Sequence, residues 1–247
     1  MELTEYLKKY PKTAIAFSGG VDSAYLLHAA HKAGADICAY YVKTAFQPQF
    51  ELDDALRLSE ELHIPMKVLH TDVLAHERIA ENPCDRCYYC KKMIFAGIQK
   101  AAGEDGFTVL MDGTNASDDK NDRPGMRATQ ELSVKSPLRE CGLTKDMVRK
   151  LSKEAGLFTW DKPAYACLAT RIPTGEIITE EKLKVTEAAE DYLFSLGFTD
   201  FRVRMTEGTA KLQVRKEQLE KLMDSRTQIV TELKKYYTSV LLDLETR

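Results

Sequence analysis

The stretch from Ser18 to Ser23, Ser-Gly-Gly-Val-Asp-Ser, combines residue types that bind a phosphate group. It stands between a short apolar, β-prone run at 13–17 and a run of Ala and Leu at helical spacing from 23 to 33. In such a strand-to-helix turn, backbone N–H groups point at one spot where the helix dipole favours negative charge. Glycines let the backbone approach an anion closely, and serines add hydroxyl donors. The predicted phosphate ligands are Ser18, Gly19, Gly20 and Ser23.

This turn differs from the GxxxxGK[ST] nucleotide loop, because no Lys follows the glycines to reach the terminal phosphates. The alternative is an ordinary glycine-rich turn between a strand and a helix. Such a turn needs neither the flanking serines nor Asp22. The complete string therefore favours anion binding.

Three cysteines within seven residues, Cys84, Cys87 and Cys90, form a second chemical group. C-x2-C-x2-C spacing brings each thiolate round a tight turn toward one centre, and both zinc sites and iron–sulfur clusters use it. Met93 stands where a ferredoxin-like run would have its next cysteine. A fourth ligand must therefore come from elsewhere, and Cys167 is the best candidate. Zinc and iron–sulfur chemistry both stay open at this point.

Two arginines alternate with apolar residues in the run Phe201-Arg202-Val203-Arg204-Met205. In a strand, this alternation places the apolar residues on one face and both guanidinium groups on the other. One interpretation is a half-buried strand with a solvated basic face. The other is a site for a phosphate or carboxylate dianion, which two adjacent guanidinium groups match well.

The elements that must position these residues follow an alternating pattern. Short apolar runs alternate with helical patterns, which predicts a mostly parallel sheet with helices on both faces. Ligands of such sheets bind at the carboxyl ends of the strands, where the loops at 18–23, 43–49 and 112–122 converge. The predicted strands are 13–17, 36–42, 66–70 and 107–111, and the predicted helices are 2–10, 23–33, 50–62, 91–102 and 143–156.

The pattern changes after Pro173-Thr174-Gly175. A helix, two alternating strands, a helix and a final strand follow, which is typical of a small α+β domain. Their predicted bounds are 179–195, 200–205, 209–214, 216–236 and 239–243. We therefore expect two domains, 1–174 and 175–247.

Composition limits the classes of protein to consider. The 247 residues are 44% apolar and 30% charged, with a net charge of −3, which argues against a broad basic surface for nucleic acid. No apolar run approaches the ~20 residues of a membrane span, and the N-terminus lacks the apolar core of a signal peptide. We expect a cytoplasmic protein, in which six cysteines indicate metal or redox chemistry before disulfides.

The string at 18–23 resembles the pyrophosphate loop (PP-loop) of the ATP pyrophosphatases, which cleave ATP between the α- and β-phosphates and adenylylate a substrate. Over nearly the whole chain, further motifs together resemble the LarE family of ATP-dependent sulfur transferases. These motifs are NPCDRCYYCKK at 82–92, DGTN at 112–115, RPG at 123–125, SPL at 136–138, GLTK at 142–145, WDKPAYACLATRIPTG at 160–175 and FRVR at 201–204.

The resemblance implies the HUP-like PP-loop fold of the adenine nucleotide alpha hydrolases, with a small C-terminal α+β domain. It also implies a reaction: a carboxylate of pyridinium-3,5-biscarboxylic acid mononucleotide is adenylylated, and sulfur replaces the acyl oxygen to give a thiocarboxylate. That product leads to the nickel-pincer nucleotide. The implied partners are this small-molecule substrate, a sulfide source and further copies of the chain in a homo-oligomer, without nucleic acid or membrane.

The resemblance also implies roles for single residues. Asp22 would help to organise Mg²⁺ around the departing pyrophosphate, and Arg202 and Arg204 would bind the substrate's phosphate. Arg171 would neutralise the carboxylate, although a surface ion pair is its alternative role. The ATP site would also include Lys43, Gly113 and Asp119. The run at 117–122 differs from the usual family order, so the acid that binds Mg²⁺ or substrate stays open.

Members of this family obtain sulfur in two ways. Some give up the sulfur of one cysteine and keep dehydroalanine, whereas others hold a [4Fe–4S] cluster with three cysteines and transfer a sulfide from its open iron. The RCYYC and ACLATR segments resemble the three-cysteine type, with Cys87, Cys90 and Cys167 as ligands. Cys84 stands where a non-ligand is expected, so it is either a spectator or a fourth ligand.

Two other functions compete with this interpretation. A tRNA thiolase of the same loop superfamily would need an RNA-binding module, which the negative charge and the lack of a basic, aromatic-rich stretch disfavour. A non-catalytic zinc protein would use all four cysteines for structure. The colour of anaerobically purified protein distinguishes an iron–sulfur cluster from zinc, because a cluster makes the protein brown and zinc leaves it colourless.

Overall fold

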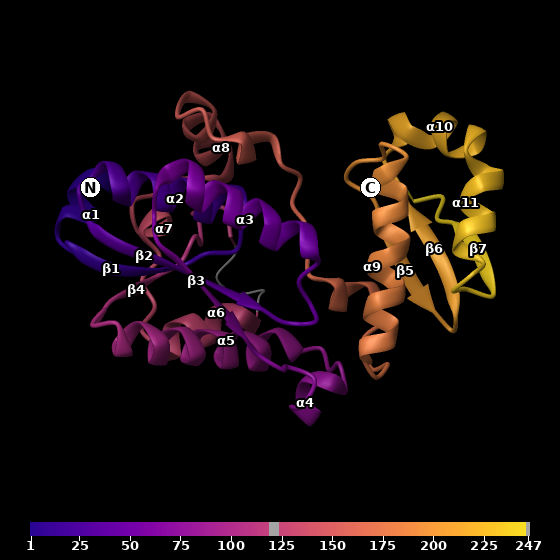
Figure 1. Ribbon diagram of the computed structural model, residues 1–247, viewed down its shortest axis with the longest axis horizontal. Coiled ribbons are helices and arrows are strands. Elements are labelled where there is room, and N and C mark those ends of the chain that lie inside the picture. Colours follow the sequence, from indigo (N-terminus) through magenta and orange to yellow (C-terminus); the bar gives the residue numbers. More distant parts are fainter. Residues whose placement is uncertain (119–123, 246–247) are drawn as a thin grey trace. The chain divides into compact units, whose positions relative to one another are not determined.

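The computed structural model describes residues 1–118 and 124–245. They form two compact units. The first comprises Met1–Val73 and Asp85–Lys162, and the second comprises Leu74–Cys84 and Pro163–Arg247 (Figure 1). These bounds differ from those of the predicted domains, 1–174 and 175–247, which stay a prediction.

Backbone pairing explains why residues 74–84 belong with the second unit. The N–H of Gly175 donates to the Asn82 carbonyl at 2.9 Å, and the N–H of Ile178 donates to the Ala80 carbonyl at 2.8 Å. Pairing over so long a separation leaves no local periodicity in the sequence.

The first unit contains a four-stranded parallel sheet with strand order β3-β2-β1-β4, which confirms the predicted α/β class. Its elements are α1 (Leu3–Lys8), β1 (Lys12–Ala16), α2 (Val21–Lys32), β2 (Asp36–Lys43), α3 (Gln49–Leu62), β3 (Met66–His70), α5 (Arg86–Glu104), β4 (Leu110–Met111), α6 (Pro124–Glu131), α7 (Pro137–Glu140), α8 (Lys145–Glu154) and the 3₁₀-helix η1 (Phe158–Asp161).

Helices cover both faces of this sheet because its central strands are apolar on both sides (Figure 1). Ile15, Ala39 and Tyr41 belong to the core that includes residues of α2 and α3. Ala14 and Tyr40 belong to a second core with residues of α5. The carboxyl ends of β1 and β4 are therefore held side by side between two packed layers.

The second unit contains a three-stranded sheet, order β5-β6-β7, in which β5 and β6 are antiparallel and β7 is parallel to β6. Buried residues of α9, α10 and α11 share one core with the strands. Its elements are α4 (Glu77–Ala80), the 3₁₀-helix η2 (Leu168–Arg171), α9 (Glu180–Ser195), β5 (Arg202–Thr206), β6 (Thr209–Gln213), the 3₁₀-helix η3 (Lys216–Gln218), α10 (Leu219–Asp224), α11 (Arg226–Leu233) and β7 (Ser239–Leu242).

Several elements differ from the sequence prediction. Of the strand predicted at 107–111, only Leu110–Met111 form β4. The helix predicted at 91–102 begins five residues earlier, at Arg86, so the cysteine segment is largely helical. Residues 124–131 form α6, which was not predicted, and the single helix predicted at 216–236 is divided near Ser225.

In the part of the chain that the structure describes, no helix is both long and apolar enough to span a bilayer.

Candidate functional site

The loop after β1 is organised by its two serine hydroxyls. Gly20 is the N-cap of α2, and the hydroxyl oxygens of Ser18 and Ser23 lie 3.1 Å apart. The Ser23 hydroxyl also donates to the Gly20 carbonyl at 3.1 Å and accepts from the Ser18 N–H at 3.3 Å. The predicted phosphate ligands therefore lie together at the N-terminus of a twelve-residue helix.

Two glycines are needed here for close backbone approach. Gly19 has φ 73°, and a Cβ atom there would lie 2.9 Å from the carbonyl oxygen of Glu51 in α3. A Cβ atom at Gly113 would lie 2.7 Å from the backbone nitrogen of Ser23. Gly113 thus lets the DGTN turn pack directly on the first turn of α2.

We expect Gly19→Ala to lower the free energy of unfolding by about 2 kcal/mol or more, because left-handed backbone is strained for Ala and the methyl group would contact Glu51. Gly20→Ala is the matched control: its φ is −82° and the nearest atom, Ser18 Oγ, lies 3.5 Å from the new Cβ. Urea denaturation of both variants checks this, and equal destabilisation would contradict the assigned loop geometry.

Asp22 is paired with a distant lysine. The Lys145 ammonium lies 2.5 Å from Asp22 Oδ2, and the Asn115 amide donates to Asp22 Oδ1 at 3.3 Å. Lys145 is the first residue of α8, which is capped by the Thr144 hydroxyl. The cation that is missing within the loop motif is therefore supplied by another element.

A second lysine also reaches the loop. Lys162 Nζ lies 3.4 Å from the Gly19 carbonyl oxygen and 2.6 Å from a carboxylate oxygen of Asp54. Sequence reasoning did not single out Lys145 or Lys162. Both stand in motifs noted above, GLTK and WDKP, but those motifs do not reveal which loop the lysines contact.

The remaining residues predicted for the ATP site belong to two other loops, at 43–49 and 112–122. Lys43 ends β2 and donates to the Gln47 carbonyl at 2.5 Å, within its own loop. Asp118 accepts a hydrogen bond from the backbone N–H of Asn115 at 3.0 Å. Asp119 lies outside the described residues, so its predicted role is not addressed by the structure.

Cys87 and Cys90 lie one turn apart in the first turns of α5, whereas Cys84 precedes the helix. Cys84 and Cys87 are exposed, and Cys90 is half-buried. The expectation that tight turns separate the cysteines is wrong for this pair, because the helix begins before Cys87. Tyr88 helps to fix that end: its hydroxyl bonds to Glu131 at 2.7 Å, and the Arg127 guanidinium lies 3.7 Å from its ring centroid.

Cys167 belongs to the second unit and is the N-cap residue of η2. The N–H and the hydroxyl of Thr170 donate to its carbonyl oxygen at 3.0 and 2.8 Å. None of the six cysteines forms a disulfide. Within each unit, as far as it is described, no three His, Cys, Asp or Glu side chains gather as metal ligands.

Arg171 is buried, with 1% of its surface exposed. Its Nε and Nη2 donate to the two carboxylate oxygens of Glu190 at 2.7 and 3.0 Å, and its Nη1 donates to the Ala166 carbonyl at 3.0 Å. Burial alone would lower the pKa of Arg171, but hydrogen bonding and charge attraction to Glu190, together with Tyr165 and Cys167, raise it overall. The structure therefore shows an ion pair that is buried, where the sequence allowed a surface one.

The predicted apolar face of the 201–205 run is confirmed, since Phe201, Val203 and Met205 are buried. The interpretation of a solvated basic face is wrong for Arg202. This residue is also buried, and its side chain donates to the Ala164 carbonyl at 2.6 Å. Arg204 is half-buried.

Arg204 connects β5 to the segment that carries Cys167. Its Nη1 donates to the Thr170 carbonyl at 2.8 Å, and its Nε donates to Gln213 at 2.6 Å. The partner of Arg171, Glu190, was not singled out from the sequence, because one acid in the charged helix 180–195 carries no distinguishing local signal.

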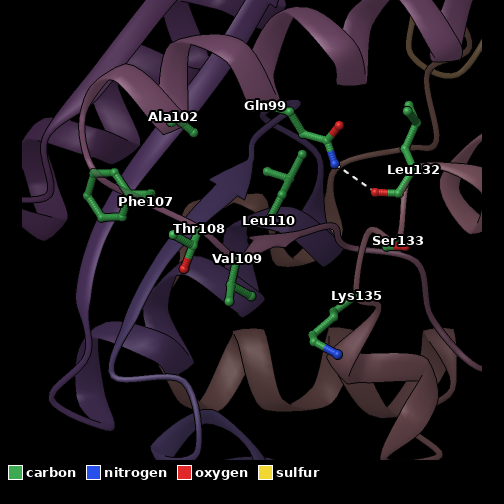
Figure 2. Close-up of a pocket in the computed structure, with 10 residues that line it drawn as sticks. Gln99, Ala102, Phe107, Thr108, Val109, Leu110, Leu132, Ser133 and Lys135 are labelled. Atoms are coloured by element: carbon green, nitrogen blue, oxygen red, sulfur yellow. Dashed lines mark hydrogen bonds between the residues drawn. The ribbon is translucent and has the colours of Figure 1, made fainter.

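A pocket of about 560 Å³ lies at the other end of β4 from the DGTN turn. Figure 2 shows Gln99, Leu110 and Leu132 around it, with the Gln99 amide donating to the Leu132 carbonyl at 2.7 Å. None of the predicted site residues lines it.

No protein-family model matches the sequence. A pyridinium-3,5-bisthiocarboxylic acid mononucleotide synthase of Lactiplantibacillus plantarum is 34% identical over 214 residues, covering 86% of this chain and 78% of that protein. An uncharacterised protein of Synechocystis sp. is 34% identical over 250 residues, covering 98% of this chain and 92% of that protein. A tRNA-specific 2-thiouridylase of Pseudothermotoga lettingae is 27% identical over 191 residues, covering 61% and 54%. On the similarity to the synthase, together with the glycine-dependent loop on a parallel sheet, the chain belongs to the LarE family of PP-loop ATP-dependent sulfur transferases.

Proposed function

We propose that this enzyme adenylylates a carboxylate of pyridinium-3,5-biscarboxylic acid mononucleotide and converts it to a thiocarboxylate. The observation that carries the proposal is the loop at 18–23, where backbone, hydroxyl and carboxylate groups and the two lysines meet at one helix N-terminus. The substrate follows from the name of the Lactiplantibacillus plantarum relative. A homo-oligomeric state and a cellular sulfide source belong to the same proposal.

In the first half-reaction, a substrate carboxylate oxygen bonds to the α-phosphorus of ATP and pyrophosphate leaves. The N–H groups of the loop, with Ser18 and Ser23, are suited to hold the phosphates, and Lys145 and Lys162 are suited to offset their negative charge. Asp22 offers the carboxylate oxygen that Mg²⁺ prefers. An ion bound there would compete with the Lys145 ammonium for Oδ2.

In the second half-reaction, sulfide replaces the acyl oxygen and AMP leaves with it. The donor set suits an iron–sulfur cluster: Cys87 and Cys90 supply two thiols from one helical turn, and Cys167 is the proposed third ligand. A bound cluster with an open iron would supply the transferable sulfide. Whether this chain instead gives up the sulfur of one cysteine is the alternative to be tested.

The proposal is tested with purified chain, ATP, Mg²⁺ and the mononucleotide under anaerobic conditions after iron and sulfide reconstitution. AMP, pyrophosphate and thiocarboxylate are expected to form together. Pyrophosphate formation that requires tRNA instead of the mononucleotide would replace this function with that of a tRNA thiolase.

Arg204 is the proposed ligand of the substrate's phosphate, because it is half-buried while Arg202 is buried against Ala164. We expect Arg204→Ala to weaken mononucleotide binding by roughly 1.5–3 kcal/mol, since a charge-assisted contact is lost, and to change ATP binding little. Arg215→Ala is the control, because Arg215 is exposed and forms a surface ion pair with Glu217. Calorimetric titrations with both ligands check this, and equal weakening for both would reject the assignment.

A further inference from the structure

The segment from Ala164 to Arg171, which carries Cys167, has little regular structure of its own. Its last four residues form the 3₁₀-helix η2, and the residues before them belong to no helix or strand. Its backbone carbonyls instead accept hydrogen bonds from three arginines. Two of them are in β5, and the third is the last residue of the segment. Arg202 donates to the Ala164 carbonyl, Arg171 to the Ala166 carbonyl and Arg204 to the Thr170 carbonyl, at 2.6, 3.0 and 2.8 Å.

Glu190 of α9 is the centre of these contacts. Its carboxylate is buried, with 1% exposure, and accepts four hydrogen bonds. Oε1 accepts from Arg171 Nε at 2.7 Å and from the Val203 N–H at 2.9 Å. Oε2 accepts from Arg171 Nη2 at 3.0 Å and from the Tyr165 hydroxyl. Glu190 therefore connects α9, β5 and both sides of the cysteine.

The ring of Tyr165 completes the arrangement. The guanidinium carbons of Arg171 and Arg202 lie 4.6 and 5.0 Å from its centroid, so the ring contacts both cations while its hydroxyl bonds to Glu190. Residues two before and four after Cys167 thus share one buried carboxylate.

We propose that Glu190 is a positioning residue for Cys167. It holds Tyr165 and Arg171 at fixed places, and these two residues define the path of the backbone between them. The expected effect of Glu190 on sulfur transfer rests on the proposed function. The contacts by which Glu190 positions the segment all lie within the second unit. A buried carboxylate that loses its partners is costly, so the native arrangement is strongly preferred over partly released ones.

The test uses hydrogen exchange, followed by mass spectrometry, of the full chain as wild type, Glu190→Gln, Tyr165→Phe and Glu181→Gln. The Gln variant keeps an acceptor at one side-chain atom and places an amide N–H₂ against the Arg171 and Tyr165 donors. Exchange in peptide 164–172, whose Thr170 and Ile172 amides are hydrogen-bonded locally, is expected to rise about tenfold or more because the segment opens more often. Tyr165→Phe should accelerate the same peptide by a smaller factor. Glu181 is exposed on the same helix, and its variant should match wild type.

A second measurement reports on the cysteine itself. After chelation and reduction, iodoacetamide alkylation of Cys167 is compared with that of Cys141 in the same molecule. We expect the ratio of the two rate constants to change about tenfold in Glu190→Gln and to stay at the wild-type value in Glu181→Gln.

Unchanged hydrogen exchange at 164–172 in both Glu190→Gln and Tyr165→Phe would overturn the proposal. Equal acceleration throughout residues 163–245 would also overturn it, because Glu190 would then be a general core residue. Loss of sulfur transfer in Glu190→Gln with wild-type exchange and alkylation would place its role elsewhere. If the wild-type chain transfers no sulfur at all, the proposed function fails, while the exchange and alkylation results still decide the positioning role.

Discussion

Replacing Asp22 with Ala is expected to abolish ATP-dependent pyrophosphate release while leaving the fold intact. Asp22 is the carboxylate within the 18–23 loop, and it lies 2.5 Å from Lys145. Its removal takes away the proposed Mg²⁺ ligand and the partner that holds the Lys145 ammonium beside the loop. Because the proposed metal and Lys145 would both offset phosphate charge, we expect the rate to fall by a factor of about 10² to 10³.

Pyrophosphate release is measured with the mononucleotide present, beside a thermal unfolding curve for each variant. Asp146→Ala is the matched control, because Asp146 is an exposed acid in the first turn of α8 next to Lys145. Lys145→Met should also reduce the rate, with less effect than the loss of Asp22. Wild-type pyrophosphate release by Asp22→Ala would remove the basis for the ATP assignment.

Replacing Cys87, Cys90 or Cys167 with Ser is expected to remove both bound iron and sulfur transfer. A cluster with an open iron needs three thiolates, and the loss of any one leaves too few protein ligands. Cys84→Ser should keep both properties. Cys84 precedes α5, whereas Cys87 and Cys90 share a helical turn. Exposure does not separate them, because Cys84 and Cys87 are both exposed.

Iron content and thiocarboxylate formation are measured for all four variants after anaerobic reconstitution. Loss of iron in Cys84→Ser would mean four protein ligands and would reject the open-iron mechanism. Sulfur transfer without iron, with dehydroalanine left at 167, would assign the chain to the sacrificial type. A colourless protein with tightly bound zinc and no transfer would support the structural zinc alternative.

The sequence by itself determined the α/β class and the place of the glycine turn between the first strand and the next helix. Both depend on local chemistry: apolar runs of strand length alternate with helical patterns, and Gly19 stands where the backbone needs φ 73°. The predicted strand at 66–70 has the bounds of β3. Thr144 and Thr179 cap α8 and α9, because a side-chain oxygen satisfies an N–H in the first turn.

Local patterns were less informative around the cysteines. C-x2-C-x2-C spacing fits a tight metal-binding turn and a helical turn equally, since residues three apart are neighbours in both. The contacts of Tyr88 with Glu131 and Arg127 stabilise the helical form, and α6 supplies both partners. The sequence near Cys87 contains no signal that predicts α6.

Only the tertiary structure decided which charges meet. Asp22 and Lys145 are 123 positions apart, and Arg171 and Glu190 belong to different elements. Burial also gave Arg202 a different environment from Arg204, although a strand pattern treats the two alike. The physical reason is that periodicity reports which face a side chain occupies, whereas a charge's partner depends on packing between elements distant in sequence.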